Sequence, residues 1–131
     1  MDRATKNGGP VSSAESREQG TWQGTWQVAT LLVGEISRPV IAGTNITVVF
    51  DGDSIRGSGG CNSYQGVYRT DGASIGVGPL ISTQAFCDDP AGVSDQEINF
   101  LSLLGTVDEF VMSGDELVLR AAGIPVISLR R

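Results

Sequence analysis

From Thr21 onward the sequence consists of short runs in which apolar and polar residues alternate, separated by turns that contain glycine. In residues 45–50, for example, Ile46, Val48 and Phe50 fall on one face of an extended chain. A period of two is the pattern of a β-strand with one buried face. The 18 glycines are about twice the average share of roughly 7%, which is typical of turns and close sheet contacts. The pattern predicts a mainly β fold.

We expect about eight strands. The clearest hairpin joins residues 46–50 to a return strand that begins at Ile55, because Gly52 in the Asp-Gly-Asp turn can adopt a positive φ without steric cost. The other runs with strand character are residues 24–33, 64–69, 74–78, 79–86, 109–113, 116–120 and 125–130.

One helix of about eleven residues is expected to interrupt the strands. Ser94 and Glu97 have the spacing of a capping box, and Val93 and Ile98 have that of a hydrophobic staple. Gly105 stands where a left-handed C-terminal cap is common. The apolar stripe of this helix is predicted to consist of Ile98, Leu101 and Leu104, widened by Phe100 and Leu103.

Strands, one helix and strands again, joined by short links, predict an α+β fold that is mainly β. Because short strands must twist to enclose a core, an antiparallel curled sheet or cracked barrel is favoured over a flat sheet. At 131 residues the chain has the size of one domain. Residues 1–20 are polar and nearly free of large apolar groups, so we interpret them as a flexible leader and residues 21–131 as the folded domain.

The charge balance argues against several classes of partner. From Thr21 onward six arginines face twelve acidic residues, so this part carries the whole net charge of −6. A nucleic-acid surface or tight binding to anionic lipid needs a basic patch, and none can be assembled here. No stretch approaches the ~18 apolar residues of a membrane-spanning helix. We expect neither nucleic-acid binding nor a transmembrane segment, and we expect a monomer.

The chain contains no histidine, which removes histidine bases, histidine-based triads and most zinc sites from consideration. We therefore expect no catalytic residues, no metal and no cofactor. The acidic residues Asp88, Asp89, Asp95 and Glu97 gather near the predicted helix start, where Asp95 and Glu97 would complement the helix dipole. A hydrolase that uses Asp88 and Asp89 is a remaining hypothesis, which requires two carboxyl groups facing each other across a cleft.

Residues 57–68, Gly-Ser-Gly-Gly-Cys-Asn-Ser-Tyr-Gln-Gly-Val-Tyr, form the most distinctive stretch. A phosphate-binding loop would need a lysine and a following helix, and this stretch continues as a strand instead. Gly57 and Gly59 lie on one face of a strand, where a helix or crossing strand can approach closely. Tyr64 and Tyr68 share a face beside the core. The interpretation is structural.

The two cysteines, Cys61 and Cys87, leave two alternatives open. A reactive thiol needs a histidine, a lysine or a helix N-terminus to lower its pKa, and Cys61 has no histidine or lysine in the folded part. The pair therefore forms either a disulfide in an oxidising compartment or two buried thiols in a reducing one. A bridge would stabilise the fold by roughly 3.5 kcal/mol through closure of its loop.

Two further features have ordinary explanations. Residues 51–54, Asp-Gly-Asp-Ser, faintly resemble a calcium loop, but Ile55 and Arg56 occupy positions where that loop needs an acid or amide and a glycine. We interpret them as a hairpin turn. Trp22 and Trp26 are an even number of residues apart, so on a strand they share a face, and core packing is favoured over a platform for carbohydrate.

Taken in order, the motifs resemble the META domain, or HslJ-like heat-shock-protein family, over residues 21–131. The most specific pieces of the resemblance are Gly60-Cys61-Asn62, Tyr64, Tyr68, Ser82-Thr83 and Cys87, which come after Gly-Thr-Trp-Gln-Val at 24–28 and before Gly-Asp-Glu-Leu-Val-Leu-Arg at 114–120. The sequence departs from the family at Ala85-Phe86, where Met-Ala is common before the second cysteine, and in the doubled tryptophan.

The resemblance implies a compact antiparallel β fold with one helix, often found in bacterial envelope lipoproteins or exported proteins. The family is linked to stress response and drug sensitivity, and related protozoan proteins are linked to virulence and secretion. It supplies no catalytic residues. It implies an extracytoplasmic location, with the leader acting as a tether to a signal or lipid anchor that would precede Met1.

These observations give a leading function hypothesis and an alternative. The first is a non-enzymatic envelope or secreted domain that binds a partner protein or maintains envelope integrity. The alternative is a carrier of a small apolar ligand such as a lipid, because a cracked barrel around one helix can leave a pocket. The identity of the partner is not encoded in any motif of the chain.

Overall fold

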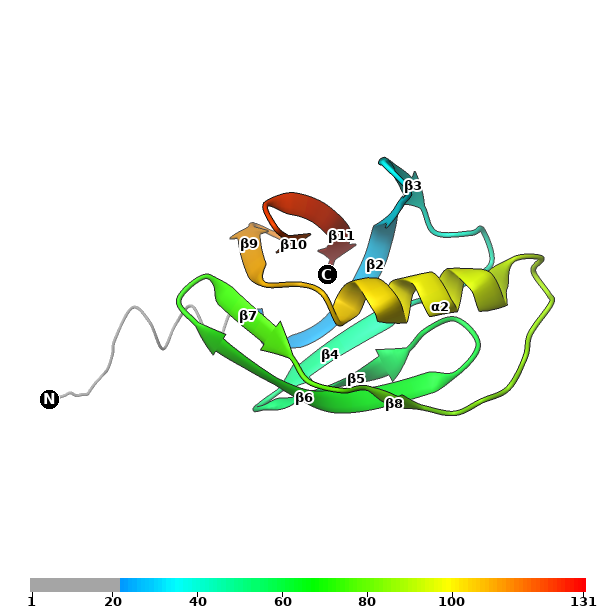
Figure 1. The fold of residues 1–131 in the computed structure, drawn as a ribbon, viewed down its shortest axis with the longest axis horizontal. Coiled ribbons are helices and arrows are strands. Elements are labelled where there is room, and N and C mark those ends of the chain that lie inside the picture. The colour runs from blue at the N-terminus through cyan, green and yellow to red at the C-terminus, as the bar shows by residue number, and fades with distance from the viewer. Residues whose placement is uncertain (1–21) are drawn as a thin grey trace, which may run out of the picture.

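The computed structural model describes residues 22–131, so the predicted leader at 1–20 lies outside the described residues. These residues form a ten-stranded sheet and one long helix (Figure 1). The elements are β2 (Gly24–Val33), β3 (Ile36–Pro39), β4 (Thr47–Asp51), β5 (Ser54–Ser58), β6 (Ser63–Asp71), β7 (Ser74–Val77), β8 (Ile81–Ser82), α2 (Val93–Leu104), β9 (Glu109–Ser113), β10 (Glu116–Ala121) and β11 (Ile124–Arg130).

Eight of the strands close into an antiparallel barrel in the order β11-β10-β9-β7-β6-β5-β4-β2. The ring closes because β2 pairs with β4 through residues 24–27 and with β11 through residues 27–31. The two remaining strands extend it, β3 beyond β2 and β8 alongside β6. The predicted mainly β fold with one helix and a curled antiparallel sheet is thus confirmed, and the sheet is a closed barrel.

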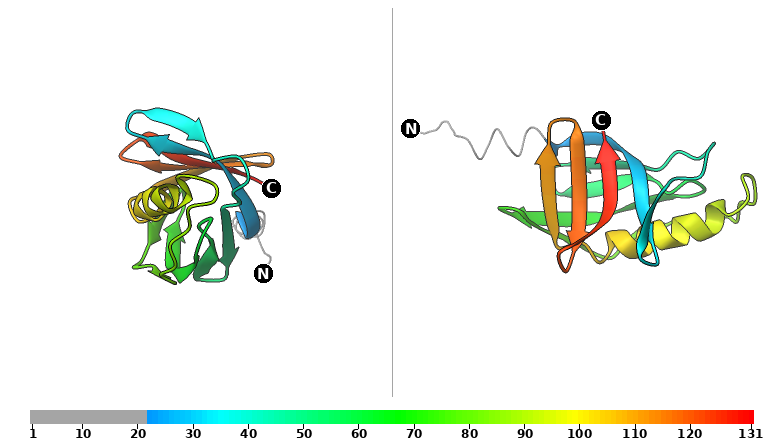
Figure 2. Two further views of the ribbon diagram at one scale, coloured as in Figure 1. Left: turned by 90° about the vertical axis from the view of Figure 1, so that its right-hand side faces the viewer. Right: turned by 90° about the horizontal axis from the view of Figure 1, so that it is seen from above.

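The weakest junction of the barrel lies between β7 and β9. Only Ser74 and Glu109 pair there, with flanking backbone bonds from Ile75 N to Asp108 O at 3.1 Å and from Phe110 N to Ala73 O at 2.9 Å. Beyond this point the two strands diverge, and α2 lies between the layer that contains β9–β11 and the layer that contains β4–β8 (Figures 1 and 2). The helix therefore packs on the side where β7 and β9 move apart beyond their single pair of residues.

Alternation along the strands places the core as predicted. Val48 and Phe50 of β4 are buried, as are Ile46 before the strand and Ile55 on β5. The Asp-Gly-Asp turn is the predicted hairpin, with Gly52 at φ 65° and Asp51 paired with Ser54. The largest fully buried side chains are Trp26, Phe50, Phe100, Ile46, Ile55, Leu104, Leu117, Leu119, Ile127, Leu129 and Val48.

The two tryptophans belong to this core. Trp22 packs edge-on against Phe50 and Tyr68, with ring centroids 5.3 and 5.6 Å away, and Trp26 is fully buried. The Trp26 indole donates a hydrogen bond to Trp22 O at 2.8 Å, so its polar atom is satisfied inside the core. The prediction of core packing is confirmed.

The two ends of the helix differ from the sequence-based prediction. The residue before α2 is Gly92, in a left-handed conformation with φ 87°, and no side chain of the described residues caps the helix. Ser94 and Glu97 make no capping box, and Ile98 is 67% exposed, so it forms no staple with Val93. Both side chains of the expected box bind partners elsewhere in the fold, which outcompete local capping. Gly105 is right-handed rather than left-handed.

Candidate functional site

The two glycines at the start of the distinctive stretch lie where other backbone and side-chain atoms come close. A Cβ added at Gly57 would lie 2.1 Å from Thr47 O of the neighbouring strand β4. One added at Gly59 would lie 2.7 Å from Glu97 Cγ on α2. The predicted close approach of a helix is therefore confirmed at Gly59, whereas at Gly57 the close atom belongs to the adjacent strand of the same sheet and not to a crossing strand.

Glu97 occupies the centre of this contact. Its side chain is 5% exposed, and its carboxylate accepts hydrogen bonds from the backbone N–H groups of Cys61 at 2.9 Å and Asn62 at 2.5 Å. The Asn62 side-chain amide donates a third bond to the other carboxylate oxygen at 2.7 Å. The turn at 60–62 thus forms a cradle of donors suited to an anion, and a carboxylate from the same chain fills it.

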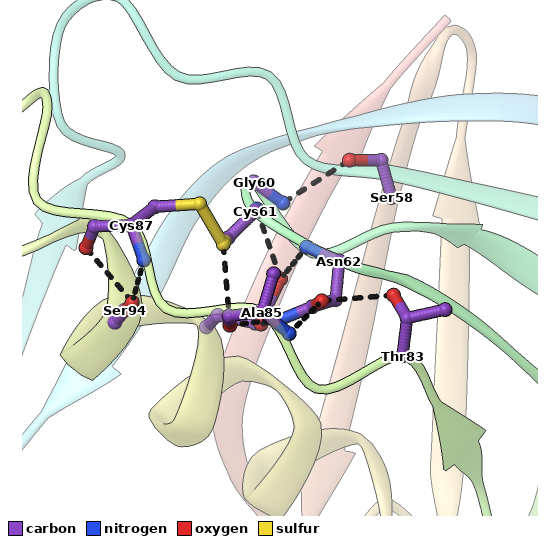
Figure 3. The surroundings of a disulfide bond; sticks show 9 residues. Ser58, Gly60, Cys61, Asn62, Thr83, Ala85, Cys87 and Ser94 are labelled. Carbon is purple, nitrogen blue, oxygen red and sulfur yellow. Dashed lines mark hydrogen bonds between the residues drawn. A yellow bond between two sulfur atoms is a disulfide. The ribbon is translucent and has the colours of Figure 1, made fainter.

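Asn62 connects the Glu97 contact to the segment that follows β8, and we call the hydrogen bonds of Glu97 and Asn62 the network. Its side-chain Oδ1 accepts bonds from Ala85 N and Thr83 Oγ1, both at 2.8 Å, and its Nδ2 donates to Ala85 O at 2.9 Å (Figure 3). The two bonds to Ala85 reproduce the pairing that a neighbouring strand would supply. Asn62 is 7% exposed, and every polar atom of its side chain has a partner. A buried amide in such a network rigidifies its surroundings.

A disulfide joins Cys61 to Cys87, with the two Cα atoms 5.9 Å apart. It links the turn of the motif to the loop before α2 (Figure 3). Ser94 on the first turn of α2 secures the same point, because its hydroxyl accepts a bond from Cys87 N and donates one to Cys87 O, each at 2.9 Å. Of the two alternatives that the sequence leaves open, the structure contains the bridge.

The bridge makes a direct prediction. Thiol titration of the unreduced, denatured protein should find no free thiol, because both cysteines are consumed. A Cys61→Ser/Cys87→Ser variant should lose about 3.5 kcal/mol of unfolding free energy, because its unfolded chain regains the entropy of a 26-residue loop. Urea denaturation of the oxidised protein and of this variant measures the loss. Two titratable thiols, or equal midpoints, would contradict the prediction.

The two tyrosines of the motif lie inside the barrel wall. The Tyr64 hydroxyl donates to Thr47 O at 2.7 Å, and burial raises the pKa of Tyr64 above its ordinary value. The Tyr68 hydroxyl donates to Gly52 O at 2.6 Å and accepts from Gln23 at 3.0 Å. Burial raises the pKa of Tyr68 as well, assisted by nearby aspartates and opposed by the Gln23 bond. Both hydroxyls act as structural donors to the hairpin.

The acidic residues near the start of the helix lie in two different environments. Asp88, Asp89 and Asp95 are exposed, whereas Glu97 points inward and is held by the motif. Within residues 22–131 no three acidic or cysteine side chains come close enough to hold a metal ion. No helix of the described part is long and apolar enough to cross a membrane.

The role of Glu97 is the main feature that sequence reasoning missed. The buried residues of α2 are Val93, Glu97, Phe100 and Leu104, with the spacing of one inward helix face. The sequence carries one local signal, because a charged residue stands in the middle of that face. Its partner in the glycine-rich turn is 35 positions away and is not indicated by any local pattern. Of the predicted apolar stripe, Phe100 and Leu104 are buried and Leu101 and Leu103 pack against the core, so the prediction is wrong for Ile98 alone, which is exposed.

The surface of the described residues carries two larger grooves, of which the first includes Thr83 of the network. One, of about 510 Å³, lies over β4, β5, β6 and β8 and is lined by residues that include Val49, Arg56, Gln65 and Ile81. The other, of about 530 Å³, lies between the β7–β8 link and the end of α2. Its lining residues are Val77, Gly78, Pro79, Leu80, Leu101, Ser102 and Gly105.

The comparison with protein families matches the META domain over residues 19–131. The chain belongs to the META domain family. In this META domain the glycine–cysteine–asparagine turn, Tyr64 and the second cysteine lie at the junction between barrel and helix, whereas Tyr68 packs against Trp22 and Phe50. No curated protein shows a significant match to this META domain.

Solved structures share the fold at low sequence identity. An NMR structure of a protein from Burkholderia xenovorans superimposes with a TM-score of 0.71 and 19% identity, covering 100% of this chain and 97% of that one. A crystal structure of a DUF4847 family protein from Bacteroides vulgatus has a TM-score of 0.62 and 14% identity, covering 87% and 96%. A further NMR structure has a TM-score of 0.63 and 18% identity, covering 85% and 92%. At these identities the similarity shows the fold alone.

Proposed function

We propose that this META domain is a non-enzymatic, extracytoplasmic module that binds a partner protein. The observation that carries the proposal is that the polar groups of the motif and its two cysteines bind other groups of the same domain. The donors of the glycine-rich turn bind the domain's own Glu97, and the two cysteines are joined to each other. The most distinctive residues of the family are thereby committed to holding segments in place, as in a binding scaffold that is rigid before it meets its partner.

The disulfide supports an extracytoplasmic location, because such bonds persist in oxidising compartments and are rare in reducing ones. The proposed location is the cell envelope or the exterior, with or without a lipid anchor. Trapping thiols with an alkylating reagent in intact cells of the source organism tests it. The full-length product should carry no alkyl group at Cys61 or Cys87 unless it is first reduced. Labelling of both cysteines in unreduced cells would overturn the extracytoplasmic location.

A second candidate is a carrier of a small apolar ligand. The groove of about 530 Å³ beside the end of α2 favours it, because Val77, Pro79, Leu80 and Leu101 supply an apolar lining. A fluorescent sixteen-carbon fatty acid is a suitable probe, with Leu80→Glu as the variant that should abolish its binding. Buried Trp22 and Trp26 are poor reporters of that groove, since neither lines it. Equal binding by both proteins, or none by either, would remove the carrier from consideration.

A further inference from the structure

An aromatic side chain stands fully outside the barrel next to the disulfide. Phe86 is 80% exposed, the highest value among the large apolar side chains of residues 22–131. Single exposed apolar residues are common on protein surfaces and need no explanation by themselves. Phe86 differs from the others in the way that its backbone is held.

The residues on both sides of Phe86 are fixed. Ala85 forms two hydrogen bonds with the Asn62 side chain, one through its N–H and one through its carbonyl. Cys87 carries the disulfide and forms two bonds with the Ser94 hydroxyl. An exposed loop would ordinarily be among the more mobile parts of a fold. This one has four hydrogen bonds and a covalent link within three residues.

The deepest polar interactions of the domain serve the same segment. Asn62 and Glu97 are the only buried polar or charged side chains among the described residues. Asn62 binds Ala85 directly, and Glu97 holds Asn62 through its backbone and its side chain. Because buried polar groups are costly unless fully paired, their use to hold the residue before one exposed phenylalanine indicates that the position of this phenylalanine matters. Closing the barrel does not require it, since the strands pair independently of Phe86.

A second exposed apolar residue lies near the same junction. Ile98 is 67% exposed and stands one turn after Ser94 on the same face of α2. Ser94 in turn contacts Cys87, the residue after Phe86. We name Phe86 and Ile98, with the Cys87–Ser94 contact between them, the Phe86 patch.

The charged residues that directly follow Cys87 and Ser94 in the sequence are all acidic. Asp88 and Asp89 follow Cys87, Asp95 follows Ser94, and all three are exposed. Within the described part of the chain the two ion pairs are Arg56–Asp51 and Arg120–Glu109, so none of these three carboxylates is paired there. An exposed apolar side chain beside acids that form no ion pair within residues 22–131 is complementary to an apolar side chain flanked by lysine or arginine.

We propose that the Phe86 patch is the partner-binding surface of this domain and that it recognises a protein segment in which apolar residues are flanked by lysine or arginine. The inference rests on the proposed partner-binding function and deepens it by naming the surface and the chemistry of the partner. A rigid aromatic anchor loses little conformational freedom on binding, which is the property of interface hot spots.

Selection of a random twelve-residue peptide library on phage against the intact, oxidised protein tests the proposal. The selected peptides should combine Leu, Phe or Trp with Lys or Arg. Synthetic versions should bind Phe86→Ala at least tenfold more weakly than the unaltered protein, and Phe86→Tyr should retain most of the affinity. Because Phe86 is exposed, its alanine variant should melt at nearly the same temperature, which separates lost binding from lost folding.

The control variant is Ile124→Ala, which removes a 54% exposed side chain at the start of β11, away from the Cys87–Ser94 junction. It should leave the affinity unchanged. Asp88→Asn/Asp89→Asn should weaken binding at low salt and flatten its salt dependence. Peptides that bind Phe86→Ala equally, or that lack basic residues, overturn the patch. Peptides that need Ile124 instead would contradict the Phe86 patch as the binding surface but would still support partner binding. If the selection recovers no binding peptide, the result counts against the patch and against partner binding.

Discussion

Replacing Gly57 with alanine should destabilise the domain by about 3 kcal/mol or more, one of the two largest effects expected of a single substitution here. The new Cβ would lie 2.1 Å from the backbone carbonyl oxygen of Thr47, far inside contact distance. Backbone cannot rotate away as a long side chain can, so β4 and β5 must move apart beside Val49 and Arg56, the last residues of their pairing. Thermal denaturation followed by circular dichroism should show a melting temperature lower by about 10 °C or more.

The matched control is Gly76→Ala on β7. A Cβ at Gly76 meets nothing within 4 Å, and its backbone lies outside the left-handed region. Alanine there should be neutral or stabilise by up to about 1 kcal/mol, since it restricts the unfolded chain. Equal melting temperatures for the two variants would show that the close approach of β4 to Gly57 is relieved without cost.

Replacing Glu97 with glutamine should cost about 2–3 kcal/mol although the two side chains have the same shape. The carboxylate accepts from two backbone N–H groups on one oxygen and from the Asn62 amide on the other. Glutamine brings an NH₂ group to one of these places, where a donor would face a donor. Either the Asn62 amide turns and releases Ala85, or a buried donor stays unpaired.

The control for this variant is Glu116→Gln, at an exposed position on β10. It should change the urea midpoint by no more than the equivalent of about 0.5 kcal/mol. Glu97→Ala should be at least as destabilising as Glu97→Gln, because it leaves all three donors unpaired and opens a cavity. If Glu97→Gln unfolds at the midpoint of the unaltered protein, the network contributes nothing to stability.

The strands were predictable because their burial follows local alternation. Residues 24–33 and 109–113 become β2 and β9 with the predicted bounds, since a period of two survives any arrangement of the sheet. β3 was missed because Ile36–Pro39 is exposed along its whole length and contains a proline, so it has no alternation to read.

The segment 79–86 shows why local patterns fail at the site. It was predicted to be a strand, and only Ile81–Ser82 is one. Farther along, Ala85 has the partners that a strand would have, but a side chain of Asn62 supplies them. The same holds for Ser94 and Glu97, whose local capping pattern is real but yields to contacts with residues seven and more than thirty positions away. Long-range side-chain pairing leaves no periodic trace in a sequence.

The carboxylate of Glu97 has a consequence for how this region moves. The amide protons of Cys61, Asn62 and Ala85 come from segments more than twenty residues apart, yet each depends directly or through Asn62 on one side chain of α2. None of these N–H groups can open to solvent alone, because its opening leaves a neighbouring group of the network without a hydrogen-bond partner. These protons should therefore exchange with deuterium together, at one common rate. Such a result would show that the turn, the loop and the first turns of the helix open as a single cooperative unit.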